Sequence, residues 1–162
     1  MKSTQAKFGF KHKSGILMAV SSLPSRYGIG SVGAPAFKFI DFLKECKQRV
    51  WQVLPLNPTA YGDSPYQSPC SFAGNPYFVD LDVLKKEFLL CEEDLKGAID
   101  NGDRVDYGKL FETRIPLLKR AYSKFSPTPK YTRFAEKNAD WLDDYALFMT
   151  LKEKNDYKSW TE

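Results

Sequence analysis

A long loop that combines aromatic rings with small polar groups follows the apolar segment at residues 53–56. It extends over about twenty residues with little helical or strand periodicity, and loops of this length in compact domains are often functional. Its aromatic residues are Tyr61, Tyr66, Phe72 and Tyr77, and its small polar residues are Asp63, Ser64, Gln67, Ser68 and Asn75. Flat aromatic faces beside hydrogen-bonding groups suit a ligand with hydroxyl groups at its edge and C–H groups on its face. The loop therefore predicts a binding site for a sugar.

Carboxylates are the groups in this region that could act as an acid, a base or a nucleophile. Those near the loop are Asp41, Asp63, Asp80 and Asp82. Asp63 follows Gly62 and precedes Ser64 and Pro65, a setting typical of an Asx-type turn. We therefore interpret Gly62, Asp63 and Pro65 as residues that shape the loop, with Asp63 as a structural residue rather than a catalytic nucleophile.

Cysteine and histidine give little support for other chemistry. The chain has three widely spaced cysteines, Cys46, Cys70 and Cys91, and a single histidine, His12. An odd number without a C-x-x-C pattern predicts neither a disulfide framework nor a metal site. Cys46 lies on a helical pattern and is predicted to be a small core residue. For Cys70, a nucleophile without a nearby base is the weaker hypothesis, and an unpaired thiol in packing is the stronger one.

Composition excludes several classes of protein. The 162 residues are 43% apolar and 15% aromatic, which is too apolar for a disordered tail. A net charge of +4 without a basic cluster argues against nucleic-acid binding. No apolar run reaches the ~20 residues that span a bilayer, and the N-terminus lacks the apolar segment of a signal peptide. We expect a cytoplasmic protein with a flexible arm at residues 1–13.

The first half of the chain alternates strand and helix patterns. Buried strands are predicted at residues 15–20 and 50–55, with a helix at 34–48 between them and Pro35 in its first turn. This spacing predicts a βαβ unit with parallel strands and a right-handed crossover. The glycines at 28, 30 and 33 have the spacing of a dinucleotide fingerprint, but the expected strand-to-helix turn is missing, so a structural loop is predicted.

Helical patterns dominate the second half of the chain. Helices are predicted at residues 84–90, 92–101, 107–125 and 134–155, and Pro116 is expected to kink or start the third of them. Residues 126–129 form a clear break. The last helix carries an apolar stripe that is predicted to be core: Trp141, Leu142, Tyr145, Phe148 and Leu151.

Several motifs resemble those of one enzyme family. They are YGDSPYQS at residues 61–68, FAGNP at 72–76, GILM at 15–18, SLP at 22–24, YGIG at 27–30 and WQVLPL at 51–56. In order and spacing they closely resemble the N-terminal signature of the 4-α-glucanotransferases (amylomaltases or disproportionating enzymes, glycoside hydrolase family 77). A weaker similarity continues through residues 105–107 and 141–148. The resemblance covers nearly the whole chain from about Gly15.

The resemblance implies a fold and an activity. Residues 14–82 would be the first βα units of a (β/α)₈ TIM barrel, and residues 83–162 a truncated helical insertion subdomain. The family transfers α-1,4-glucan segments between maltooligosaccharides or glycogen- and starch-type glucans by a retaining double displacement, without a cofactor. Its nucleophile and acid/base come from later strands, so the catalytic groups are expected beyond Glu162. A complete barrel takes about 250 residues, and we expect the isolated chain to be an inactive N-terminal portion.

The resemblance also assigns roles to residues of the loop. Ser64 and Tyr66 would line the donor side of the cleft, Tyr61 a second glucan-contacting surface, and Asn75 would hold the loop or approach the cleft. The structural alternative is that Tyr66 and Tyr77 pack under the loop. Two other hypotheses stay open: a truncated module that holds glucan on its own or pairs with a complementary C-terminal piece, and a non-functional remnant with exposed strand edges.

Overall fold

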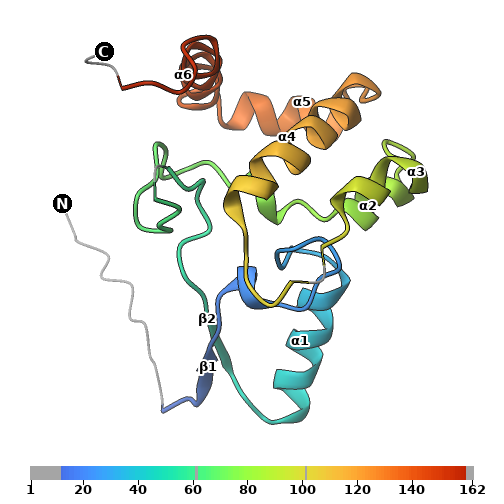
Figure 1. Cartoon of the computed structure of the whole chain (residues 1–162). Helices are drawn as coiled ribbons and strands as arrows, with labels where there is room; N and C mark the ends of the chain where they lie inside the picture. The colour runs from blue at the N-terminus through green and yellow to red at the C-terminus, as the bar shows by residue number, and fades with distance from the viewer. Residues whose placement is uncertain (1–11, 61, 101, 160–162) are drawn as a thin grey trace, which may run out of the picture.

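The structure is a computed structural model that describes residues 12–60, 62–100 and 102–159. Strand β1 (Gly15–Leu17), helix α1 (Ala34–Glu45) and strand β2 (Val50–Gln52) form one part of the molecule, and the helices form the other (Figure 1). The helices are α2 (Leu81–Lys86), α3 (Glu92–Leu95), α4 (Tyr107–Ser123), α5 (Pro129–Lys137) and α6 (Leu142–Lys154). Short 3₁₀ turns lie at η1 (Val20–Ser22), η2 (Pro76–Phe78) and η3 (Lys96–Ala98).

The predicted βαβ unit is present. Strands β1 and β2 pair in parallel, with Gly15 opposite Val50, Ile16 opposite Trp51 and Leu17 opposite Gln52. Both strands are shorter than predicted, and the prediction that they are buried is wrong: Trp51 is partly buried and the other five strand residues are exposed. The amide of Met18 still donates to the carbonyl of Gln52 at 3.0 Å, but the chain then turns into η1 on one side and towards Pro55, which has no amide proton, on the other.

Helix α1 covers the sheet through a small apolar core. Its buried residues are Val20, Leu23 and Ala36, and the partly buried residues packed against them are Met18, Phe39, Trp51, Val53 and Phe78. The Trp51 ring meets Phe39 edge-on at 5.0 Å, and its Nε1 donates to the carbonyl of Met18 at 2.9 Å. Trp51 is thus a structural residue. The prediction that Cys46 is a core residue is wrong. Cys46 is exposed, because α1 ends at Glu45 and Cys46 is its C-terminal cap.

A second core joins the loop after β1 to the helices. Its buried residues are Tyr27, Leu81, Leu90, Leu95, Ala98 and Ala121, with Leu84, Leu89 and Leu117 packed against them. Tyr27 forms an isolated parallel bridge with Asp100, and the amide of Gly28 donates to the carbonyl of Asp100 at 3.2 Å. Gly28 adopts a left-handed φ of 73° there, a conformation that glycine takes without strain.

The helical half differs from the prediction in two respects. Helix α4 begins at Tyr107 and continues through Pro116, so this proline does not start the helix, and the expected kink stays a prediction. The helix predicted at 134–155 is two helices, because Asn138 interrupts it: its side-chain amide donates to the carbonyl of Phe134 at 2.7 Å, and its own carbonyl accepts from the amide of Trp141 at 3.2 Å.

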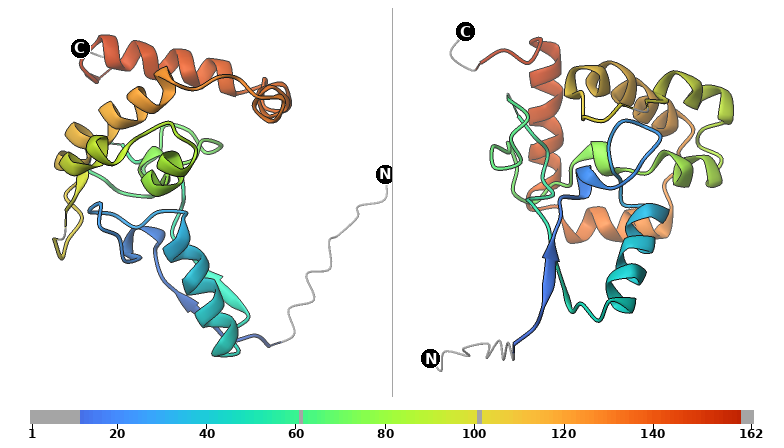
Figure 2. Two further views of the ribbon diagram at one scale, coloured as in Figure 1. Left: turned by 90° about the vertical axis from the view of Figure 1, so that its right-hand side faces the viewer. Right: turned by 60° about the horizontal axis from the view of Figure 1, so that its bottom comes forward.

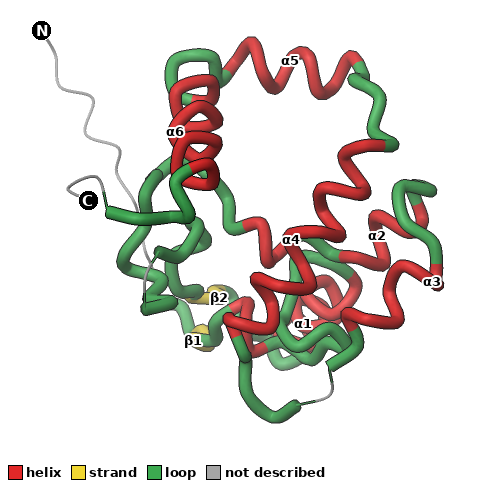
Figure 3. The backbone as a smooth tube through the Cα atoms, turned by 45° about the horizontal axis from the view of Figure 1, so that its top comes forward, coloured by secondary structure: helices red, strands yellow, loops and turns green. Residues whose placement is uncertain are grey.

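The predicted core stripe of the last helix is also wrong. None of the described residues of α6 is buried, and Leu151 is 38% exposed. Helix α5 leads the chain away from α4, and α6 begins beside the loop at residues 57–75 (Figures 2 and 3). There the Trp141 ring stacks on Phe72 with centroids 5.8 Å apart. The apolar stripe therefore meets a surface loop instead of a core. No helix in the described ranges has the length and apolar character needed to cross a membrane.

The buried carboxylate of Asp80 links the segment before α1 to the start of α2. Its side chain is buried, and its Oδ1 accepts from the amide of Val83 at 3.0 Å and so caps α2. Its Oδ2 accepts from the hydroxyl of Ser31 at 2.7 Å. Gly33 leaves room for this carboxylate, because a Cβ at that position would lie 1.8 Å from Oδ2. The start of α1 and the start of α2 are held by the same buried group.

We expect Gly33→Ala to lower the free energy of unfolding by about 3 kcal/mol, because the new methyl group must displace a buried, hydrogen-bonded carboxylate. The control is Gly97→Ala, where a Cβ would meet nothing within 4 Å; that change should alter stability by less than about 1 kcal/mol. Urea unfolding of the three proteins measures the difference. Equal effects at the two glycines would contradict the packing described.

Candidate functional site

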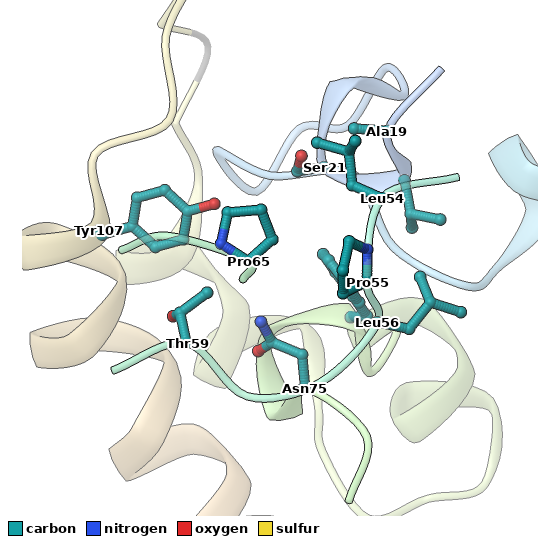
Figure 4. A pocket seen from close by; sticks show the side chains of 11 residues that line it. Ala19, Ser21, Leu54, Pro55, Leu56, Thr59, Pro65, Asn75 and Tyr107 are labelled. Atoms are coloured by element: carbon teal, nitrogen blue, oxygen red, sulfur yellow. The ribbon is translucent and has the colours of Figure 1, made fainter. Parts of the chain in front are cut away.

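A small cavity of about 100 Å³ lies where β1 and β2 end (Figure 4). It is lined by Ala19, Val20, Ser21, Leu54, Pro55, Leu56, Thr59, Pro65, Asn75, Phe78 and Tyr107. A shallower hollow of about 410 Å³ adjoins it and shares Leu56, Asn75 and Phe78 with it. Ligand pockets usually measure ~300–1,000 Å³. Two adjoining concave surfaces, rather than one closed pocket, thus lie near the strand ends.

Asn75 lies between the cavity and the hollow. Its side chain is 6% exposed, and its backbone amide donates to the carbonyl of Leu56 at 2.8 Å. The Oδ1 atom accepts from the amide of Tyr77 at 2.9 Å, which caps η2. With Oδ1 fixed in this way, the amide nitrogen is on the side of Thr59 and Pro65 (Figure 4). Asn75 therefore holds the end of the loop and also presents a hydrogen-bond donor to the cavity.

Ser64 and Tyr66, in the loop at residues 57–75, do not line the cavity, although Pro65 between them does. Ser64 is half-buried, and its Oγ accepts from the amide of Tyr66 at 3.3 Å. Tyr66 is 74% exposed, so it does not pack under the loop. Tyr61 lies outside the described residues.

A tight turn shapes the tip of the loop. Gly62 and Asp63 have positive φ values of 83° and 55°, and the amide of Asp63 donates to the carbonyl of Ala60 at 3.1 Å. The amide of Ala60 in turn donates to the carbonyl of Gln67 at 3.0 Å and closes the tip. Backbone bonds thus form this turn, and the contribution of the Asp63 carboxylate stays a prediction.

Asn57 organises the inside of the loop and was missed in the sequence. Its Nδ2 donates to the carbonyls of Cys70, Ser71 and Ala73, at 3.3, 2.7 and 3.1 Å. The signal for it was weak: a single amide residue directly after the apolar segment 53–56. Because its three acceptors are backbone groups, the sequence around residues 70–73 carried no matching pattern.

Tyr107 is the second residue that sequence reasoning missed. It stands in the first turn of α4, far along the chain, and lines the cavity with its hydroxyl towards Pro65 (Figure 4). Its ring meets the Tyr77 ring edge-on at 6.0 Å. Burial, with a smaller effect of the Asp63 charge, raises the pKa of both phenols, so both stay protonated at neutral pH and can donate hydrogen bonds. The signal was the Asp106 cap, whose Oδ1 accepts from the amide of Lys109 at 3.0 Å.

The aspartates near the loop stand apart from the cavity. None of Asp41, Asp63, Asp80 and Asp82 lines it. Asp82 accepts from the Tyr27 hydroxyl at 2.8 Å and from Arg26 at 2.7 Å. Partial burial acts to raise the pKa of Asp82, but these two hydrogen bonds outweigh it and keep that pKa below its usual value. Across the described ranges, no three His, Cys, Asp or Glu side chains gather in a way that could hold a metal ion.

The sequence model of one family, 4-alpha-glucanotransferase, matches residues 18–162. The chain belongs to this family. It is 48% identical over 157 residues to the 4-alpha-glucanotransferase of Streptococcus pneumoniae and 49% identical over 144 residues to that of Thermus thermophilus. These alignments cover 94% and 85% of this chain, but only 31% and 28% of the relatives. The chain thus spans less than a third of the length of these curated family members.

A solved structure of the family has the same fold over the shared part. It is the amylomaltase from Streptococcus agalactiae in complex with acarbose, with a TM-score of 0.83 and 40% sequence identity. The match covers 92% of this chain and 31% of the amylomaltase chain. The mixed α/β arrangement described above is therefore that of part of an amylomaltase.

We expect Asn57→Ala to loosen the loop at residues 57–75, because three carbonyls lose their common donor. The free energy of unfolding should fall by about 1–2 kcal/mol, and limited proteolysis should cut within the loop sooner. Gln48→Ala is the control, since this exposed amide makes one bond of 3.3 Å to Cys46. If both variants resist proteolysis like the unmodified chain, Asn57 does not organise the loop.

Proposed function

We propose that this chain is the N-terminal portion of a 4-α-glucanotransferase that moves α-1,4-glucan segments between maltooligosaccharides or glycogen- and starch-type glucans. The observation that carries the proposal is the family match over residues 18–162, together with the likeness in fold to an amylomaltase. That amylomaltase was solved with acarbose, which supports an oligosaccharide as the ligand. The same match favours an enzyme portion over a stand-alone glucan-binding module or a non-functional remnant.

The two parallel strands fit the start of a (β/α)₈ barrel, followed by a helical insertion at residues 83–162. In such barrels the loops after the strands form the active site, and here η1 and the loop at 57–75 follow β1 and β2 directly. Within the described residues the sheet has two strands, and Ile16, Leu17 and Val50 on it are 42%, 59% and 39% exposed. Further strands, supplied by the C-terminal portion of the enzyme as a partner, would cover these side chains and close the barrel.

In this proposal the chain binds and orients glucan and does not break the bond. Ser64 and Tyr66 contact the donor sugar, Asn75 donates a hydrogen bond from the cavity wall, and Tyr61 belongs to a second glucan surface. The exposed ring of Tyr66 offers a flat face to the C–H groups of a glucose unit. Gly62, Asp63 and Pro65 hold the tip of the loop in place.

The reaction itself needs groups that we assign to the segment beyond Glu162. A retaining transfer uses a carboxylate nucleophile and a second carboxyl group as acid and base, about 5–5.5 Å apart. No aspartate or glutamate among the described residues lines the cavity. Asp80 lines the adjoining hollow, but its two oxygens accept hydrogen bonds from Ser31 and from the amide of Val83. The glucan would therefore be held by this chain on one side and attacked by carboxylates from the other, with no cofactor.

The test compares this chain with a chimera in which it replaces the matched part of the 4-alpha-glucanotransferase of Streptococcus pneumoniae. With maltotriose as substrate, we expect the chimera to release glucose and form longer maltooligosaccharides, and the isolated chain to do neither. A folded but inactive chimera would contradict the proposal. Turnover by the isolated chain that disappears in Asp63→Asn would contradict the assignment of catalysis to the missing portion.

Within the chimera, Tyr66→Ala should lower kcat/KM about tenfold or more while leaving the melting temperature unchanged. The reason is that Tyr66 is 74% exposed, so its ring contributes to glucan contact and little to packing. Tyr122→Ala is a matched control, because Tyr122 is equally exposed, at 74%, but lies on α4 and outside the loop at residues 57–75. Equal loss of activity in the two variants would exclude a specific role for Tyr66.

A further inference from the structure

Arg114 is the most deeply buried charged residue of the described chain. It lies in the middle of α4 and is 1% exposed. Its Nη2 donates to the carbonyl of Tyr77 at 2.8 Å, whereas Nε and Nη1 have no hydrogen-bond partner within the described part of the chain. Burial lowers the pKa of Arg114 to about 10, so it still carries its charge at neutral pH. A buried charge with incomplete pairing costs stability, which means that stability does not explain this residue.

The surroundings of Arg114 join three segments. Its guanidinium lies 6.0 Å from the centre of the Tyr27 ring, which belongs to the loop after β1. The buried charge of Asp80, at the cap of α2, favours its charged form. The carbonyl that Arg114 binds belongs to η2, which directly follows the loop at residues 57–75. Helix α4 therefore contacts the strand-end loops through a buried cation as well as through Tyr107.

Three side chains contact Tyr77: those of Asn75, Tyr107 and Arg114. Tyr107 and Arg114 are seven residues apart on α4 and so lie on the same face of the helix. Tyr107 packs against the Tyr77 ring, and Arg114 binds the Tyr77 carbonyl. The amide of Tyr77 donates to Oδ1 of Asn75. This bond sets the direction in which the other end of the Asn75 amide points.

We propose that Arg114 is a positioning residue: by fixing the carbonyl of Tyr77 it orients the Asn75 amide in the cavity and couples the helical part of the chain to the sugar-binding loop. The proposal rests on the proposed function for its effect on transfer, but not for its effect on the loop. This role would explain why a guanidinium with incomplete hydrogen bonding is buried at this position.

The first experiment measures amide hydrogen exchange in the 162-residue chain. Arg114→Met keeps an unbranched apolar side chain but removes the donor, and we expect the amides of Asn75, Tyr77, Phe78 and Val79 to exchange about tenfold faster, while those of α1 stay unchanged. Arg114→Lys retains a charged donor and should show a smaller increase at the same amides. Arg133→Met, on the exposed face of α5, is the matched control and should change none of them.

Two outcomes of the exchange experiment overturn the proposal. One is unchanged exchange at these four amides in folded Arg114→Met. The other is a uniform increase over the whole chain, which would mean a general loss of stability. If Arg114→Met does not fold, Arg114→Lys decides: faster exchange confined to the four amides supports the proposal, and exchange equal to that of the unmodified chain overturns it.

The second experiment measures maltotriose disproportionation by the chimera. We expect Arg114→Met to raise KM about tenfold with kcat within about twofold, because a misplaced Asn75 weakens glucan binding without touching the carboxylates. Lysine should restore part of the affinity. A lowered melting temperature with unchanged KM would mean a purely structural role and would overturn the proposal. If the chimera with Arg114 intact is inactive, the proposed function fails, and the exchange experiment still decides the role of Arg114.

Discussion

Parallel pairing of β1 and β2 is the constraint on which the rest of the structure depends. Parallel neighbours need a crossover, and α1 supplies it. The pairing also places the C-terminal ends of both strands at one edge of the sheet. The residues that follow the two strands therefore meet there, although they are separated by more than thirty residues in sequence: Ser21 after β1, and Leu56 and Asn75 after β2, line one cavity.

Buried polar groups add to the apolar core around Tyr27 in joining this edge to the helices. Asp80 holds Ser31 and the start of α2, and the helix α4 side chains Tyr107 and Arg114 hold Tyr77. These hydrogen bonds and this ring contact end at turns or helix caps near the cavity. Directional bonds fix the positions of loops more narrowly than apolar contacts do, which suits a surface that must present hydrogen-bonding groups to a ligand.

The sequence predicted the features that depend on neighbours in the chain. Strand and helix periodicity predicted the βαβ unit and most helices, and the motifs predicted the family. It failed where the outcome depends on distant or backbone partners. Asn57 binds carbonyls that have no sequence signature, and Tyr107 reaches the cavity only because α4 packs against η2. The stripe on α6 looked like core by its spacing alone, yet it faces a loop. Cys46 was misplaced because the helix ends one residue before it.

The most direct test of the central claim is a crystal structure of the chimera with acarbose. We expect sugar rings over the C-terminal ends of β1 and β2, with Tyr66 beside a ring face and with Ser64 and Asn75 within hydrogen-bonding distance of hydroxyl groups. A sugar bound away from the strand-end loops, with these three residues free of contact, would contradict it.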